Sequence, residues 1–214
     1  MLEFGLKAIL AYLLGTMLGS LILGRLKGVD IRRMGSGNAG ATNAARTVGK
    51  GFGAAVLVFD VAKGVIAVTL VPLIKFPLIG SDPGPNGPWI TLLCAVSVIL
   101  GHVYPIWYGF RGGKGVATIL GVLGALDPWL LLPVVGCWLC VVLLTGYVGL
   151  ASMVAGGAAI IGAWYLEPSN GPLIAFCGAA ALFVVFTHRG NIARMCAGTE
   201  HRLRTRFPFR SRAA

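Results

Sequence analysis

Acidic side chains are scarce in this sequence. Its 214 residues include seven Asp and Glu against 18 Lys and Arg, and charged residues make up 12% of the chain, about half of the ~25% that is typical of soluble domains. The seven carboxylates are scattered singly, so they supply few ligands for a catalytic Mg²⁺, which proteins bind through carboxylates. We therefore expect no metal and no other cofactor, and we expect any activity to persist in EDTA.

Charge is missing altogether from long stretches of the chain. Residues Pro128–Leu166 form a run of 39 residues without a charged side chain, and hydrophobic residues make up 57% of the sequence. One membrane crossing needs ~20 residues, so this run contains two crossings. We expect a single helical membrane domain over residues 1–203, followed by a basic cytoplasmic tail at 204–214.

The hydrophobic pattern predicts an all-α integral membrane protein with about seven transmembrane helices. The apolar segments lie at about 5–24, 52–74, 88–104, 115–127, 129–145, 149–166 and 172–187. The fourth segment would be only ~18 Å long at ~1.5 Å per residue, too short for a hydrocarbon core of ~30 Å. Either residues 111–115 extend it, or it forms a re-entrant hairpin with the fifth segment. Both arrangements return the chain to the same side.

Basic residues predict the orientation of these helices. Fifteen of the 18 Lys and Arg lie in residues 25–51, in residues 105–114 and from residue 188 onward. Because the loops on the cytoplasmic side carry the excess of Lys and Arg, we expect the N-terminus outside and the C-terminus in the cytoplasm. Anionic membrane lipid explains most of the basic tail, at ~1 kcal/mol per cation.

Three polar segments interrupt the apolar ones: Gly35–Gly51, Gly101–Thr118 and Thr187–Arg202. Each is dense in glycine, asparagine, hydroxyl and cationic side chains, and the predicted orientation places all three on the cytoplasmic face. Glycine lets a backbone amide approach a ligand closely, and successive N–H groups can form a concavity that binds anions. The three segments therefore predict one anion-handling site.

The first polar segment contains a literal G-x-G-x-x-G at residues 35–40, but it lacks the preceding strand that a dinucleotide site needs. A Walker A loop is also excluded, because Gly51 stands where Ser or Thr is required. The remaining donors suit a phosphate together with a polyol hydroxyl, and they are Ser36, Asn38, Thr42, Asn43 and Arg46. The alternative is a capping and turn segment that leads into the next helix.

The second polar segment has cations at the start of a predicted helix. Arg111-Gly112-Gly113-Lys114 precedes the fourth apolar segment. A helix N-terminus offers free N–H groups and partial positive charge, which favour an oxyanion, and Lys114 would place a compact charge on it. His102, at the end of the preceding helix, is either a structural hydrogen-bonding residue, which is favoured, or a base.

The third polar segment places His188, Asn191 and Arg194 at i, i+3 and i+6, close to one face if the segment is helical. We expect Glu200 to neutralise a nearby arginine.

Two charged residues lie within the second apolar segment. Asp60 and Lys63 stand at i and i+3. Charges inside a membrane are costly, so they indicate function by default. A structural pair formed between the two is favoured over a catalytic role.

These segments, in this order, resemble the bacterial acyl-phosphate:glycerol-3-phosphate acyltransferases, the PlsY family. The likeness covers essentially the whole chain as far as Leu203. It rests on four motifs, namely Gly35–Asn43 (GSGNAGATN), Asp60–Gly64 (DVAKG), Gly101–Thr118 (GHVYPIWYGFRGGKGVAT) and His188–Glu200 (HRGNIARMCAGTE). The departures are small: Trp107, Arg111, Gly149 and Met195 stand where Phe, Lys, Ser and Leu are commoner.

The resemblance implies transfer of a fatty acyl group from acyl phosphate to the 1-hydroxyl of glycerol 3-phosphate, giving 1-acylglycerol 3-phosphate (lysophosphatidic acid) and phosphate. It also implies a multi-pass protein of the bacterial cytoplasmic (inner) membrane that takes part in phospholipid synthesis. Catalytic roles carry over to Ser36, Arg46, Lys114, His188 and Asn191. Substrate binding is expected of Gly37, Asn38, Thr42, Asn43, His102, Arg111, Gly112, Gly113, Ser152, Arg189, Arg194 and Glu200. Among these, the amides of Gly112 and Gly113 are our candidates for the oxyanion of acyl phosphate.

The expected partners are acyl phosphate, glycerol 3-phosphate and membrane lipid, with the peripheral enzyme that makes acyl phosphate as a further candidate. The short basic tail carries no nucleic-acid-binding module, so nucleic acid is not expected. An H-x-x-x-x-D motif, used by soluble-type glycerol-phosphate acyltransferases, is absent. No Ser–His or Cys–His pair is evident, which favours direct attack over an acyl-enzyme.

Two other classes of protein are alternatives to an acyltransferase. A membrane anion transporter would explain the seven segments and the intramembrane charges, but the polar segments are predicted at one face and no inverted repeat is detectable. A non-catalytic lipid-binding protein would explain the basic tail, but not the clusters of Asn, His and Gly.

Overall fold

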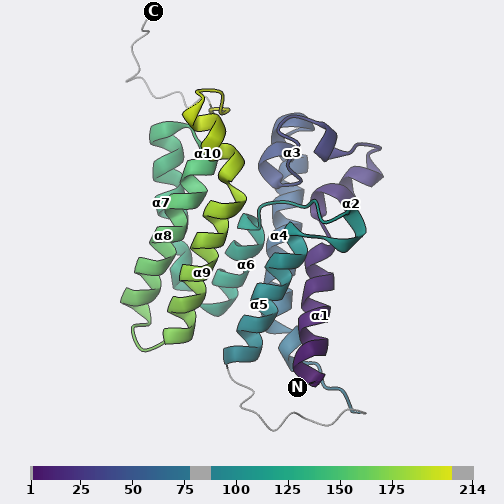
Figure 1. The fold of residues 1–214 in the computed structure, drawn as a ribbon, viewed down its shortest axis with the longest axis vertical. Helices are drawn as coiled ribbons and strands as arrows, with labels where there is room; N and C mark the ends of the chain where they lie inside the picture. Colours follow the sequence, from purple (N-terminus) through teal and green to yellow (C-terminus); the bar gives the residue numbers. More distant parts are fainter. Residues whose placement is uncertain (1, 78–87, 204–214) are drawn as a thin grey trace, which may run out of the picture. The chain divides into compact units, whose positions relative to one another are not determined.

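The computed structural model describes residues 2–77 and 88–203, and the chain divides into two compact units, Met1–Pro128 and Trp129–Ala214. Within the described residues all regular structure is helical (Figure 1). Unit 1 holds α1 (Leu2–Thr16), α2 (Gly19–Leu26), α3 (Ala41–Thr47), α4 (Lys50–Thr69), α5 (Pro88–Val103) and α6 (Val116–Leu126), with 3₁₀ turns η1 (Ile31–Arg33), η2 (Val71–Leu73) and η3 (Ile106–Tyr108). Unit 2 holds α7 (Leu131–Thr145), α8 (Val148–Leu166), α9 (Gly171–Thr187) and α10 (Arg189–Cys196), and the turn η4 (Pro128–Leu130) precedes α7.

From the second predicted apolar segment onward, the helices match the prediction closely. Four described stretches are long and apolar enough to cross a membrane, namely Lys50–Leu73, Trp89–Tyr108, Pro128–Thr145 and Val148–Leu166. Two bent pairs also qualify if each is one span: α1 with α2, at 46°, and α9 with α10, at 52°. Helix α6 has 11 residues, so the fourth segment is short, as expected. The helical architecture is confirmed. The seven crossings and the orientation stay predictions, as does the domain boundary at residue 203; the tail beyond it lies outside the described residues.

The first apolar segment is not one helix, although the sequence predicts a continuous run over 5–24. Helix α1 ends at Thr16 and α2 begins at Gly19. Neither proline nor charge marks this position, and the cause lies in another helix. Lys63 on α4 donates its Nζ hydrogens to the carbonyls of Gly15 (2.9 Å) and Met17 (3.0 Å). Carbonyls at a helix C-terminus lack partners within the helix, so the lysine satisfies them and stabilises the break.

Glycines set the distance between α1 and α5, which lie side by side in unit 1. A Cβ added at Gly15 would collide with the carbonyl of Val98, and one added at Gly101 would collide with the carbonyl of Tyr12. The backbones of the two helices are therefore in direct contact. Small residues that permit such contact are typical of helix pairs in membranes, where dispersion replaces the hydrophobic effect.

Helices α4 and α6 make the same kind of contact. A Cβ at Gly64 would meet the carbonyl of Thr118, and one at Gly121 would meet the carbonyl of Val61. The short helix α6 is thus held against the longer α4 at two close backbone contacts, and the residues directly before it are positioned with it. These residues belong to the second polar segment.

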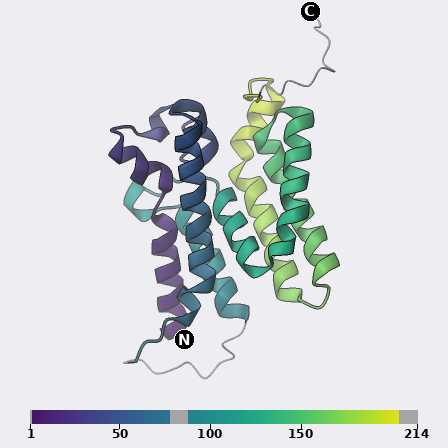
Figure 2. The same cartoon turned by 180° about the vertical axis from the view of Figure 1, so that it is seen from behind.

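Both polar segments of unit 1 lie toward the end of the unit opposite the first residues of α1 (Figures 1 and 2). Helix α3 belongs to this end, and a small apolar cluster holds it there. In this cluster Ala44 of α3 packs with Ile31, Phe52 and Val56. The structure of unit 1 is therefore consistent with the prediction that these two segments lie on the same side of the membrane.

In unit 2, α8 packs against α7 and α9 (Figure 2). Gly146 ends α7 with a φ of 76°, and its carbonyl accepts a hydrogen bond of 2.8 Å from the N–H of Leu203. At the end of α9 the N–H of His188 donates to the carbonyl of Val184 at 3.0 Å, and α10 begins at the next residue. His188 thus stands at the 52° bend between α9 and α10.

Candidate functional site

Asn43 of α3 organises the first polar segment. Its buried Nδ2 group donates to the carbonyls of Ile31 (3.2 Å), Met34 (2.9 Å) and Asn38 (3.1 Å). Its Oδ1 accepts from the N–H of Ser36 at 3.0 Å. The amide is occupied by backbone groups on both sides, so in this structure Asn43 positions the loop. These contacts fit the alternative of a capping and turn segment, and the substrate-binding role of Asn43 stays a prediction.

Ser36 is exposed on the loop that Asn43 holds. It stands between Gly35, with a φ of 55°, and Gly37, with a φ of 72°. Left-handed backbone on both sides of one residue strongly favours glycine. A Cβ at Gly35 would also collide with the Oδ1 of Asn43. The two glycines let the chain present the Ser36 hydroxyl outward.

Helix α3 presents two more of the predicted residues, Thr42 and Arg46, which are both exposed. Asn38 is half-buried beside them. The substrate-binding roles predicted for Gly37, Asn38 and Thr42 stay predictions, as does the catalytic role of Arg46.

The amides of Gly112 and Gly113 have partners within the protein. Gly112 donates its N–H to the carbonyl of Val103 and Gly113 donates to the carbonyl of His102, both at 3.1 Å. This corrects our assignment of these amides to an oxyanion, because their hydrogens are used to close the turn after α5. Lys114 follows directly and is half-buried.

Helix α6 begins at Val116, shortly after Gly112 and Gly113. Gly115, with a φ of 83°, is its N-cap residue, as expected for a helix that opens within the second polar segment. The hydrogen bonds of Gly112 and Gly113 hold the backbone directly before Lys114, whose role as a point charge on an anion stays a prediction.

His102 belongs to a buried polar cluster with Asp60 and Lys63. The Lys63 Nζ lies 3.0 Å from the Asp60 Oδ1, and the His102 Nδ1 lies 3.7 Å from the same oxygen. The predicted pairing of Asp60 with Lys63 is confirmed. The His102 ring also lies directly against Gly113, where a Cβ would collide with its Nε2. His102 therefore contacts the segment that carries Lys114. This contact fits the prediction that His102 has a structural role.

In unit 2, His188 is buried and its ring has a defined orientation. The Nδ1 lies 2.8 Å from the carbonyl oxygen of Val184. Because a carbonyl oxygen can only accept, Nδ1 carries the hydrogen, and the lone pair of the neutral ring is on Nε2. This tautomer suits a residue that accepts a proton through Nε2.

Asn191 and Arg194 meet at one carboxylate. The Asn191 Nδ2 donates to the Oε1 of Glu200 at 2.7 Å, and the Arg194 Nε donates to its Oε2 at 2.7 Å. The predicted neutralisation of an arginine by Glu200 is confirmed, and α10 is helical, as the shared face requires. The sequence did not indicate that Asn191 shares the carboxylate. Substrate contacts of Arg194 and Glu200 stay predictions.

The other two predicted residues of unit 2 bond to neighbours in the same unit. Ser152 is buried; its Oγ donates to the carbonyl of Val148 (3.0 Å) and accepts from the Nε1 of Trp138 (3.3 Å). Arg189 donates to the carbonyl of Phe186 (3.0 Å) and its guanidinium lies 4.4 Å from that ring's centroid. Their predicted substrate roles are untested by these contacts.

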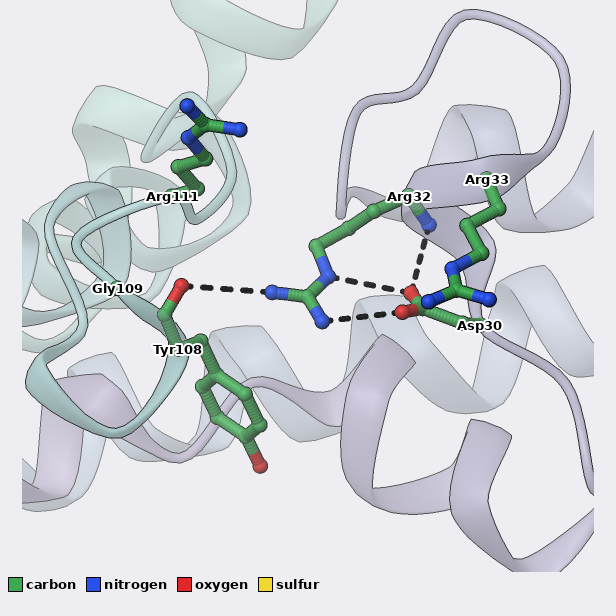
Figure 3. A pocket seen from close by; sticks show the side chains of 6 residues that line it. All are labelled: Asp30, Arg32, Arg33, Tyr108, Gly109 and Arg111. Atoms are coloured by element: carbon green, nitrogen blue, oxygen red, sulfur yellow. Dashed lines mark hydrogen bonds and ion pairs between the residues drawn. The ribbon is translucent and has the colours of Figure 1, made fainter.

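One pocket of unit 1 contains residues that sequence reasoning did not bring together. Its volume is about 560 Å³ and it is lined by Asp30, Arg32, Arg33, Tyr108, Gly109 and Arg111 (Figure 3). Of these, only Arg111 was predicted as a site residue. Asp30 and Arg32 are close in the sequence, but Tyr108 is 76 residues from Arg32, so no local pattern could reveal the pocket.

Asp30 and Arg32 form the ordered wall of that pocket. The Arg32 Nε and Nη2 donate to the two carboxylate oxygens at 3.1 Å and 3.0 Å, and its Nη1 donates to the carbonyl of Tyr108 at 3.4 Å. These hydrogen bonds lower the pKa of Asp30 and raise that of Arg32. Both groups are therefore charged at neutral pH.

Metal ligands are not grouped in the part of the chain that the structure describes. Within residues 2–77 and 88–203, no cluster of three His, Cys, Asp or Glu side chains could hold a metal ion.

The fold and these clusters define a class: a helical membrane protein with glycine-rich loops that carry cations, amides and a histidine. The sequence profile of the family described as glycerol-3-phosphate acyltransferase matches residues 6–198. The chain belongs to this family.

Individual relatives agree with that assignment. A glycerol-3-phosphate acyltransferase of Chlorobaculum parvum is 38% identical, with 95% of this chain and 97% of the relative covered. One from Thermosynechococcus vestitus is 40% identical over 93% and 94%. Among solved structures, the glycerol 3-phosphate form of PlsY (YgiH), an integral membrane glycerol 3-phosphate acyltransferase, has a TM-score of 0.80 at 36% identity, over 94% of this chain and 96% of that one. The structure is thus that of an integral membrane acyltransferase.

Proposed function

We propose that this protein transfers a fatty acyl group from acyl phosphate to the 1-hydroxyl of glycerol 3-phosphate, forming 1-acylglycerol 3-phosphate and phosphate. The observation that carries the proposal is the likeness of almost the whole chain, at 36% identity, to a protein solved in glycerol 3-phosphate and lysophosphatidic acid forms. The motif resemblance adds the acyl donor. The proposal places the protein in the bacterial cytoplasmic membrane, where a peripheral enzyme would supply acyl phosphate.

The reaction balances without a covalent enzyme intermediate. The 1-hydroxyl oxygen attacks the carbonyl carbon of acyl phosphate and forms the new C–O bond. The C–O bond to phosphate then breaks, and phosphate leaves with both electrons. The hydroxyl proton passes to a base and finally to the released phosphate. Acyl phosphate is a mixed anhydride with a good leaving group, so the enzyme mainly has to align the reactants and stabilise the oxyanion.

His188 is our candidate for the base. Its Nδ1–H bond to the Val184 carbonyl, at 2.8 Å, orients the ring and leaves the lone pair on Nε2. A phosphate oxygen of the substrate is the alternative acceptor. Histidine is the side chain that most often acts as a general acid or base.

The cations Arg46 and Lys114 are assigned to the phosphates. A guanidinium can form two parallel hydrogen bonds to a phosphate, whereas an ammonium acts as a point charge. In our proposal Ser36 and Asn191 contact the glycerol 3-phosphate and the reaction centre. Because the Gly112 and Gly113 amides are occupied, we assign the developing oxyanion to Lys114.

The experiment that tests this function uses purified full-length protein in detergent with palmitoyl phosphate and radiolabelled glycerol 3-phosphate. We expect lysophosphatidic acid to form with and without EDTA. Turnover in detergent would exclude transport as the sole function. No product from acyl phosphate, or product only from an acyl thioester, would overturn the proposed donor.

Variants then test the residues. We expect Lys114→Ala and His188→Gln to lower kcat/KM by at least about a hundredfold, the lower end for a general base. Lys50→Ala, which removes an exposed cation of unit 1, is the matched control and should retain activity. An acyl group that stays covalently attached to the quenched, denatured protein would refute direct attack.

A further inference from the structure

The pocket beside η3 has a charge distribution that suits an anion. Its lining residues include three arginines and one aspartate. Asp30 is paired with Arg32 through two hydrogen bonds, so these two charges cancel. The guanidinium groups of Arg33 and Arg111 form neither a hydrogen bond nor a salt bridge with any residue that the structure describes. The pocket therefore carries a net charge of about +2 that the protein itself does not neutralise.

The two uncompensated arginines come from different elements. Arg33 ends η1, beside Asp30, and Arg111 follows η3 on the opposite side of the pocket (Figure 3). Arg32 lies between them and is held by Asp30 and by the Tyr108 carbonyl. The inner wall is thus rigid, while the outer cations are exposed at its two edges. A guanidinium presents paired N–H donors that match the geometry of a phosphate.

Exposed apolar residues are the sequence neighbours of two residues that line the same pocket. Ile106, Trp107 and Phe110 are 48%, 69% and 57% exposed, and they flank Tyr108 and Gly109, which line it. The stretch Trp89–Tyr108 is one of the candidate membrane spans, so these residues stand at its end. Exposed Trp and other large apolar residues at the end of a span are typical of the membrane–water interface. These features together suit an amphiphilic anion, whose phosphate would lie in the pocket and whose apolar part would lie in the membrane.

We propose that this pocket binds the phosphate of an anionic phospholipid, with Arg33 and Arg111 as its ligands and Arg32 as the fixed wall between them. The proposal concerns a lipid of the surrounding membrane, and it gives Arg111 a role other than the substrate binding that the family resemblance implies. Among the described residues, Asp30 is the one carboxylate that lines the pocket, and its hydrogen bonds go to Arg32.

A binding measurement on the full chain in detergent micelles tests this proposal. Dioctanoyl phosphatidylglycerol and dioctanoyl phosphatidylcholine are titrated separately, and heat or intrinsic tryptophan fluorescence reports binding. We expect the anionic lipid to bind about tenfold more tightly, or better. Both headgroups carry a phosphodiester, but the quaternary ammonium of phosphatidylcholine offsets its charge, whereas phosphatidylglycerol leaves that charge to the two arginines. Equal affinity for the two lipids in the wild-type protein would overturn the proposal without any variant.

Variants locate the binding. The double variant R33Q/R111Q should lose the preference for the anionic lipid. The matched control R25Q/K50Q removes two exposed cations of the same unit outside the pocket and should keep it. If both doubles lose the preference equally, the lipid responds only to overall charge, and the specific site is refuted. Should R33Q/R111Q fail to fold, R33K/R111K keeps both charges, and its expected weaker preference tests the paired donors.

Competition distinguishes the source of the phosphate. Inorganic phosphate at millimolar concentration should not displace the short-chain lipid from the wild-type protein. Displacement would show a site for free phosphate and would overturn the lipid assignment. Displacement by glycerol 3-phosphate would show instead that the pocket belongs to the substrate site. Because each readout is binding, failure of the proposed acyl transfer would leave these results unaffected.

Discussion

Lys63 and Asp60 form an ion pair of 3.0 Å inside α4, with 2% and 1% of their side chains exposed. The lysine makes two further hydrogen bonds, to the carbonyls of Gly15 and Met17, and the aspartate accepts from the N–H of Gly19 at 3.3 Å. The pair therefore connects α4 to both ends of the break between α1 and α2. In this protein a buried charge pair stabilises an irregular backbone.

Removal of one charge of this pair should destabilise the protein much more than removal of both charges. Lys63→Met leaves the Asp60 carboxylate buried without its cation, and we expect a loss of about 3–5 kcal/mol in the free energy of unfolding. The double variant D60N/K63M should recover part of that loss, because no uncompensated charge remains. Recovery should be incomplete, since the carbonyls of Gly15 and Met17 still lose their donor. Unfolding in mixed detergent micelles measures all three proteins.

Lys50→Met is the control for that series, because it removes an exposed cation at the start of the same helix. It should change stability by less than about 0.5 kcal/mol. A double variant less stable than Lys63→Met would contradict the interpretation.

Gly101→Ala should separate α1 from α5. The added Cβ meets the Tyr12 carbonyl, and a methyl group forced into a packed contact costs roughly 1–3 kcal/mol. Gly5→Ala, in the interior of α1 with open space around it, should instead gain up to ~1 kcal/mol from helix propensity. Thermal unfolding of the two variants should shift in opposite directions. If both variants shifted the unfolding temperature in the same direction, the close contact of α1 with α5 would not explain the effect of Gly101→Ala.

Asn43→Asp should disrupt the first polar segment. The substitution replaces the donating amide by an oxygen that faces the carbonyls of Ile31, Met34 and Asn38. Buried carbonyls that lose their donor cost about 1–3 kcal/mol, and repulsion by a charged oxygen adds to this. We expect faster proteolysis within residues 35–40 and a loss of acyl transfer.

Asn170→Asp is the matched control for that change. Asn170 is an N-cap residue whose Oδ1 accepts from the N–H of Leu173 at 3.2 Å, and an aspartate accepts equally well there. This variant should be as stable as the wild type. If Asn43→Asp is tolerated to the same degree, the hydrogen bonds of Asn43 do not hold the loop.

The Asp30–Arg32 pair should make the stability depend on pH on the acid side. The pKa of Asp30 is lowered mainly by its hydrogen bond to Arg32, so its stabilising effect is fully present above the unfolded value of about 3.9. It is lost as the pH falls through the lower folded value. The difference in Tm between the wild type and Asp30→Asn should be constant above about pH 5 and shrink below about pH 4. If the Tm difference between the two proteins grew as the pH fell, the predicted direction of the pH dependence would be wrong.

Much of the helical architecture could be predicted because long apolar runs leave few alternatives. The uncharged run over 128–166 had to be divided, and the structure divides it at Gly146, between Thr145 and Val148. The pairing of Asp60 with Lys63 and of Glu200 with a nearby arginine followed from the cost of unpaired charge. Each of these inferences rests on a physical requirement that the local sequence can express.

Other features depend on partners that only the fold supplies. A glycine-rich segment before a helix can direct its amides to a ligand or to backbone carbonyls, and for Gly112 and Gly113 the carbonyls of Val103 and His102 decide. The break after Thr16 depends on Lys63, which belongs to another helix. The pocket beside η3 joins arginines from distant parts of the chain. Periodicity and motif spacing contain no information on such contacts.

The contact between Gly15 and the carbonyl of Val98 also affects how saturation mutagenesis of this protein should be read. Neither Gly15 nor Gly101 carries a functional group, yet every side chain introduced there would push α1 away from α5. In a growth selection both positions would score as intolerant as a catalytic residue. Only a separate count of folded molecules in the membrane, set against turnover per molecule, would distinguish a lost helix contact from lost chemistry.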